Sequence, residues 1–115
     1  MSTTKWMKLM RIAAALSTKV PRMNYKLVHG PEIHRGHTPL CAESVEAEWF
    51  AEPLIYKEVE WVEFPFEYEI PRGSGLAPSM QRQDITSLKH QLENAADFPL
   101  QETDTGLRVV AYVPA

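Results

Sequence analysis

The sequence predicts one small α+β domain, a mainly antiparallel sheet with an N-terminal amphipathic helix and a second helix near residues 79–96 packed on one face. A length of 115 residues suits a single domain. Apolar residues recur at helical spacing in two segments, and several other segments alternate apolar with polar residues as strands do. The expected order after the first helix, three strands, a helix and two strands, gives an α+β fold with a largely antiparallel sheet.

Residues 5–20 have the spacing of an amphipathic helix. At about 100° per residue, the basic side chains gather on one side and the apolar ones on the other. The basic residues are Lys5, Lys8, Arg11 and Lys19. Pro21 disfavours helical geometry in Val20, so we expect the helix to end there.

The next segments are less regular. Residues 23–29 alternate in the manner of a strand that closes at Gly30. Residues 30–40 contain two prolines and two glycines and predict an ordered loop. Residues 42–51 suit either a strand or a short helix, and the alternation favours a strand.

The strongest β signal covers residues 54–70, where aromatic and β-branched residues alternate with Glu. Pro65 should bend this run or divide it into two strands. Residues 71–78, which include Arg-Gly-Ser-Gly, predict a flexible loop.

The last third predicts a helix and two short strands. Ser79 or Asp84 begins the helix, which ends near Ala96 and carries an apolar stripe. Residues 98–113 then read as strands on either side of residues 103–106. We expect one strand face to carry Val109, Ala111 and Val113.

Charge is distributed unequally along the chain. Residues 1–31, the helix and first strand, hold six Lys or Arg and no acid, whereas residues 32–115 hold six basic and all fifteen acidic residues. The acidic body disfavours nucleic-acid binding, and we expect a protein partner or a homo-oligomer instead. No apolar run is long enough for a transmembrane segment, although the basic helix leaves peripheral membrane contact open.

Cysteine usage bears on the compartment. The single Cys41 cannot form an internal disulfide, which favours an intracellular and most simply a cytoplasmic setting. The acid-free basic N-terminus also has the composition of an organelle-targeting segment, and that alternative stays open.

One cluster suggests a metal site. Imidazole and thiol groups, the donors that zinc prefers, occur four times within thirteen residues. The four residues are His29, His34, His37 and Cys41. Their spacing matches no standard zinc motif, so ordinary histidines of a surface loop are the competing interpretation.

Paired glutamates in the expected strands have two interpretations. They keep the solvent face of a sheet charged and discourage edge pairing, or they form a docking surface for a basic partner. The pairs are Glu46 with Glu48, Glu58 with Glu60, and Glu67 with Glu69.

These observations favour a non-catalytic protein–protein interaction protein, an accessory subunit or small regulator, and no catalytic residues are assigned. An acidic β surface and the basic helix would contact the partner. The residues expected there are Trp6, Lys8, Arg11, Glu58, Glu60 and Trp61. One alternative is a metal-binding protein or small metalloenzyme with zinc at the His/Cys cluster. Another is a small-molecule-binding domain with an aromatic pocket built from Tyr25, Trp49, Trp61 and Phe64.

Overall fold

The first element of the computed structural model, which describes residues 1–46, 49–51 and 53–111, is helix α1 (Thr3–Ala15). Ser2 caps it by accepting a hydrogen bond from the Lys5 amide at 3.2 Å. Trp6, Leu9 and other apolar residues of the predicted stripe are buried. The helix ends at Ala15, earlier than predicted, because the chain turns through residues 16–19 before Val20 enters the core.

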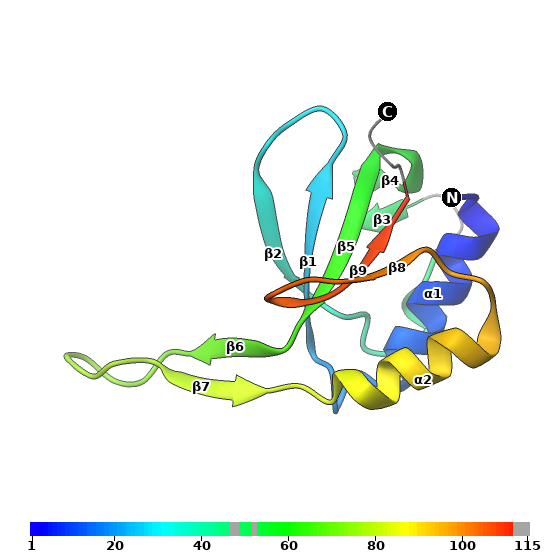
Figure 1. Ribbon diagram of the computed structural model, residues 1–115. Coiled ribbons are helices and arrows are strands. Elements are labelled where there is room, and N and C mark those ends of the chain that lie inside the picture. Colours follow the sequence, from blue (N-terminus) through cyan, green and yellow to red (C-terminus); the bar gives the residue numbers. More distant parts are fainter. Residues whose placement is uncertain (47–48, 52, 112–115) are drawn as a thin grey trace.

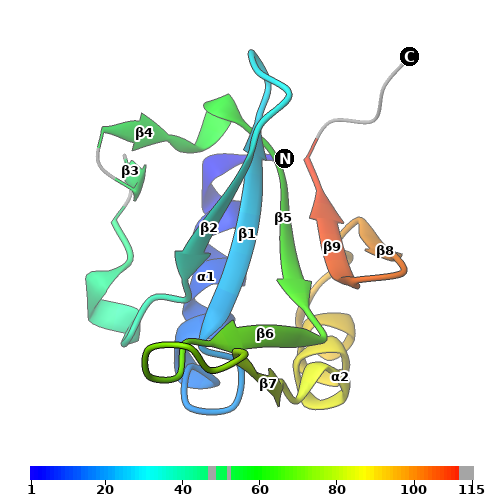
Figure 2. The ribbon, with the colours of Figure 1, turned by 90° about the vertical axis from the view of Figure 1, so that its left-hand side faces the viewer.

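Five antiparallel strands form the main sheet of the described residues, in the order β2-β1-β5-β9-β8. Figure 2 shows this sheet in front of both helices, which cover only its far face. The fold class predicted from the sequence is therefore confirmed. The strands are β1 (Arg22–Leu27), β2 (Ile33–His37), β5 (Val59–Pro65), β8 (Leu100–Glu102) and β9 (Gly106–Val110).

Strand β2 occupies part of the segment that was expected to be a loop. It pairs with β1 from Arg22 opposite His37 to Lys26 opposite Ile33. Its sequence, Ile-His-Arg-Gly-His, has little strand propensity of its own, so the prediction of a loop over the whole of residues 30–40 was wrong. Pairing with β1 outweighs the local preference.

Residues 42–51 do not form one continuous strand. A short 3-10 helix η1 (Ala42–Ser44) precedes strand β3 (Trp49–Ala51), which pairs with β4 (Leu54–Ile55). A second 3-10 turn η2 (Tyr56–Glu58) then leads into β5. Phe50 holds this small hairpin against the core by meeting the Tyr25 ring edge-on at 4.9 Å.

The run over residues 54–70 divides near Pro65, as predicted. Strand β5 ends at Pro65, and β6 (Glu67–Ile70) leaves the main sheet to pair with β7 (Ser79–Arg82). Residues 79–82 are therefore strand, and the predicted helix start at Ser79 was wrong. The other predicted start, Asp84, is the N-cap of helix α2 (Ile85–Ala95).

The core lies between the sheet and the two helices. Trp6 and Leu9 from α1 meet Leu88 and Leu92 from α2 beneath Val62, Phe64, Leu107 and Val109 of the central strands. Ala111 packs against this core as expected beside Val109, and Val113 lies outside the described residues. In the described part of the chain, no helix is long and apolar enough to cross a membrane.

Candidate interaction surface

The β6–β7 hairpin, residues 67–82, forms an arm that extends from the side of the sheet left open by the helices (Figure 1). Its two strands pair only with each other among the described residues. An isolated two-stranded hairpin is at most marginally stable in water. The base of the arm must therefore supply the contacts that hold it.

Gln83 provides most of those contacts. This residue is only 7% exposed, and its side chain carboxamide accepts from the Arg22 amide at 2.7 Å. The same carboxamide donates to the carbonyls of Arg22 at 3.1 Å and Pro65 at 2.8 Å. One side chain thus joins the end of β7 to the beginning of β1 and the end of β5.

Arg22 holds the arm a second time through its side chain. Because Met23 and Tyr25 face the core, strand alternation places Arg22 on the open face. Its guanidinium carbon lies 5.1 Å from the centre of the Tyr68 ring on β6, a cation–π contact. Backbone and side chain of one residue therefore fix the angle between arm and sheet.

The arm carries apolar side chains that stay partly exposed. Ile70 is 39% exposed, Met80 53% and Leu76 61%. Gly75 at the tip has φ of 79°, a left-handed conformation that favours glycine in the turn. A fixed arm with apolar residues along it has the character of a contact surface.

The open sheet face is polar, and its charges are paired in two places. Lys26 meets Glu60 at 3.0 Å, and Arg108 meets Glu63 at 3.2 Å. The Arg108 guanidinium also covers the Trp61 ring at 3.9 Å from its centre. Trp61 is therefore buried although no helix covers it.

Glu63 is a buried carboxylate with a complete set of partners. It is 5% exposed, and it accepts hydrogen bonds from the hydroxyls of Thr103 at 2.7 Å and Thr105 at 2.9 Å. Together with the Arg108 contact, these bonds tie the β8–β9 turn to β5. The arrangement satisfies the buried charge and leaves no oxygen directed at a ligand.

The comparisons with known proteins place the chain in a family. A family model described as a family of unknown function, DUF6678, matches residues 1–115. The chain belongs to this family. No curated protein and no solved structure matched.

In this DUF6678 chain the four predicted metal ligands do not come together. His34 and His37 are three residues apart on β2 and so point to opposite faces of the sheet. His34 stacks on Tyr25 at 5.0 Å, whereas His37 lies 3.4 Å from an Arg22 nitrogen. Among the described residues, no three His, Cys, Asp or Glu side chains are grouped to hold a metal ion.

The other two predicted ligands lie apart from this strand pair. His29 sits in the β1–β2 turn, 3.8 Å from a Glu58 oxygen. Cys41 is exposed before η1, and its thiol has no hydrogen-bond partner in the described structure. The sequence spacing is short, but the hairpin distributes the donors along its length.

Most residues predicted to bind a partner make contacts within the chain. Trp6 is completely buried, and Trp61 lies beneath Arg108. The ammonium of Lys8 donates to the Ala95 carbonyl at 2.8 Å, and Lys5 donates to the Asp97 carbonyl. Lysines of α1 therefore donate hydrogen bonds to carbonyls at the C-terminal end of α2, where positive charge is favourable.

The glutamates expected on an acidic β surface are also engaged. A Glu58 oxygen accepts from the Ile55 amide at 3.1 Å at the start of η2, and Glu60 pairs with Lys26. Of the predicted contact residues, Lys8 and Arg11 are exposed. Basic residues on neighbouring strands, which sequence order does not reveal, offset the acidic runs.

Three aromatic residues of the predicted pocket lie in different places, and the fourth, Trp49, is half-buried on β3 opposite Ile55. Phe64 is completely buried in the core, and Trp61 is on the opposite face of β5. Tyr25 instead joins a cluster with His34 and Phe50.

Tyr56 stacks on Trp6 beside this cluster, and its burial there raises its pKa above 10.0. Arg11 opposes the increase, and Glu46 adds to it.

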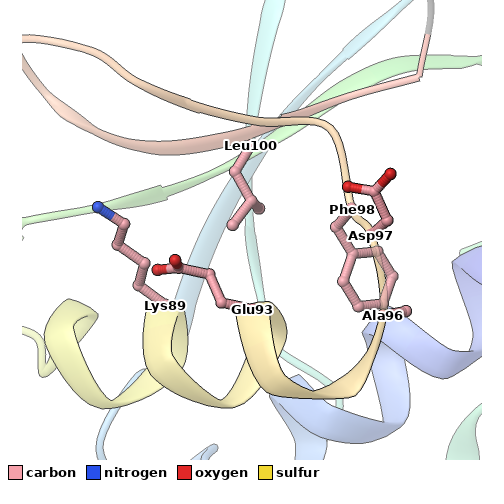
Figure 3. A pocket seen from close by; sticks show the side chains of 6 residues that line it. All are labelled: Lys89, Glu93, Ala96, Asp97, Phe98 and Leu100. Atoms are coloured by element: carbon pink, nitrogen blue, oxygen red, sulfur yellow. The ribbon is translucent and has the colours of Figure 1, made fainter.

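Two hollows lie near the end of α2. The first, of about 460 Å³, lies between Lys89 and Glu93 of α2 and Leu100 of β8 (Figure 3). Its lysine is held by Glu102 at 2.7 Å, a contact that also raises the pKa of Lys89. The second, of about 450 Å³, borders Met1, Lys5 and Val110.

Proposed function

We propose that the protein is a non-catalytic interaction protein, an accessory subunit or small regulator, that contacts a protein partner through the β6–β7 arm and the adjoining open sheet face. The observation that carries the proposal is the arm itself. It is fixed at its base by Gln83 and Arg22, while Ile70, Leu76 and Met80 stay exposed along it.

A fixed arm suits recognition for two physical reasons. Apolar side chains that are already in place gain burial on binding, and an ordered hairpin loses little conformational entropy in the complex. Free strand edges offer backbone N–H and C=O groups to a strand supplied by a partner. The contact surface in this proposal differs from the one expected from sequence, since Trp6, Lys8 and Glu60 already have partners within the chain.

The test compares partner binding by three forms of the full-length chain in its own cells. The arm variant carries Ile70→Ser, Leu76→Ser and Met80→Ser, and the control variant carries Val28→Ser and Leu40→Ser. These control residues are 45% and 84% exposed but lie outside the arm. Cross-linking followed by quantitative mass spectrometry measures the proteins attached to each form.

We expect at least one protein to be attached to the wild type and to the control variant but not to the arm variant. Hydrogen exchange of the purified complex should then show protection concentrated in residues 67–82. Sedimentation of the purified chain identifies the case in which the partner is a second copy. Recovery of the same proteins by the wild type and the arm variant would refute the proposal.

A further inference from the structure

Cationic side chains gather where the arm meets the open sheet face. Arg22 and His37 face each other across β1 and β2, and Arg35 is opposite Asn24 on the same side. We call Arg22 and Arg35, with the neighbouring His37, the cationic corner. Arg35 and His37 are exposed, and Arg22 is half-buried.

The two arginines of this corner differ from the other cations of the open face in their ion pairing. The other cations of the open face have carboxylate partners, Glu60 for Lys26 and Glu63 for Arg108. In the described part of the chain, neither Arg22 nor Arg35 forms an ion pair. Two guanidinium groups without an ion-pair partner therefore lie in this corner of a protein whose net charge is -3.

Arg22 is also oriented in advance. Its guanidinium contacts the Tyr68 ring, and Gln83 fixes its backbone. A guanidinium fork held in place is suited to a carboxylate, which it can bind through two parallel hydrogen bonds. Because these contacts already restrict the Arg22 side chain, it loses less conformational entropy when a ligand binds.

The surroundings of the corner select the kind of anion. Ile33 shares a strand face with Arg35 and is 59% exposed, and Ile70 shares an arm face with Tyr68 and is 39% exposed. Apolar neighbours suit a peptide that combines acidic and apolar side chains. The ring of Trp61, which a nucleic-acid base would need for stacking, is covered by Arg108.

We infer that the cationic corner binds an acidic segment of the partner, with carboxylates at Arg22 and Arg35 and apolar side chains beside Ile33 and Ile70. This inference rests on the proposed function and deepens it by naming the chemistry of the partner. Charge complementarity would provide selectivity and speed association, and the arm would provide apolar contact area.

The test uses a short fluorescein-labelled peptide in which Glu alternates with Val, with binding followed by anisotropy at low and high salt. The test variants are Arg35→Glu and the milder Arg35→Met. The control is Arg11→Glu, which makes the same charge change on an exposed arginine of α1. Circular dichroism confirms that each variant is folded.

Arg35→Glu should weaken binding by about tenfold or more and Arg35→Met by less, while Arg11→Glu stays within about twofold of the wild type. Salt should weaken wild-type binding. The inference is overturned if the wild type does not bind the peptide, if the two Glu variants lose affinity equally, or if a single-stranded oligonucleotide binds as tightly.

Failure here and failure of the proposed function are distinguishable. If Arg35→Glu has no specific effect but the arm variant still loses its cellular partner, only the acidic character of the partner is wrong. If the arm variant keeps every cellular partner, the proposed function itself is wrong.

Discussion

The Gln83 side chain forms hydrogen bonds with both the amide and the carbonyl of Arg22, as an adjacent strand residue would, although the two residues lie 61 positions apart. The Arg22 side chain in turn contacts Tyr68 on the arm that Gln83 terminates. This reciprocal arrangement fixes the arm relative to the sheet. The proposed contact surface depends on it.

Replacing Gln83 with Ala should lower the free energy of unfolding by about 2 kcal/mol or more, because buried backbone groups of Arg22 and Pro65 lose their partner. Urea denaturation measures the change. The control is Gln81→Ala, an exposed β7 residue that should have little effect. Equal stability of the two variants would show that Gln83 does not hold the arm.

Glu63 and Arg108 should act as a coupled pair. A double-mutant cycle with Glu63→Gln and Arg108→Met should give a coupling free energy of about 1 to 3 kcal/mol, because either single change leaves a charge without its ionic partner. Thermal and urea unfolding of the four proteins provide the values. Strictly additive effects would contradict the geometry of this network.

Gly106, the first residue of β9, lies opposite Pro65 at the end of the neighbouring strand β5. A Cβ atom there would come within 2.3 Å of the Phe64 carbonyl oxygen and 2.8 Å of the Pro65 Cα. Gly106→Ala should therefore destabilise the protein by about 2 kcal/mol or more, since backbone must move to relieve the contact. Gly30→Ala is the control because its Cβ would have no neighbour within 4 Å.

Asp84 should make stability depend on pH through its role as the α2 cap. Hydrogen bonds from the Ser87 hydroxyl and amide lower the pKa of Asp84 below 3.8. The charged cap thus stabilises the fold fully above that value, and the contribution is lost as pH falls through the lowered pKa. An Asp84→Asn variant should be less stable than the wild type at pH 7.

The difference between wild type and Asp84→Asn should shrink between pH 7 and about pH 2, because protonation of Asp84 removes the charge of the cap. Urea denaturation at both pH values measures it. Asp104→Asn, in the exposed β8–β9 turn, serves as the control and should match the wild type throughout. A difference for Asp84→Asn that persists unchanged in acid would mean that the carboxylate charge is not its source.

The sequence predicted those elements whose cause is local. The α1 stripe around Trp6 and Leu9, the break at Pro65 and the cap at Asp84 each depend on neighbours within a few residues. Strand β2 was missed because its Gly- and His-containing sequence becomes a strand only beside β1. Local pattern does not determine such pairing.

The proposed contact surface was harder to predict than the fold. Trp6 and Lys8 are residue types that suit a partner interface. In the structure, however, Trp6 is buried in the core and Lys8 donates a hydrogen bond to the Ala95 carbonyl. Nothing in the sequence around Gln83 indicated its role, because a single glutamine forms no motif that predicts hydrogen bonds to distant strands. Arg22 belonged to the basic N-terminal segment, but its position beside Tyr68 depends on contacts 46 residues apart.

The most direct test of this account is the distance between arm and sheet, measured by electron spin resonance on labels introduced by Gln81→Cys and Gln101→Cys. Cys41→Ser removes the native thiol, which is exposed. If Gln83 and Arg22 fix the arm, the distances between the two labels form one narrow distribution, which broadens when Gln83→Ala is added. A broad distribution with Gln83 intact, or one that Gln83→Ala leaves unchanged, would contradict the claim that Gln83 and Arg22 fix the arm.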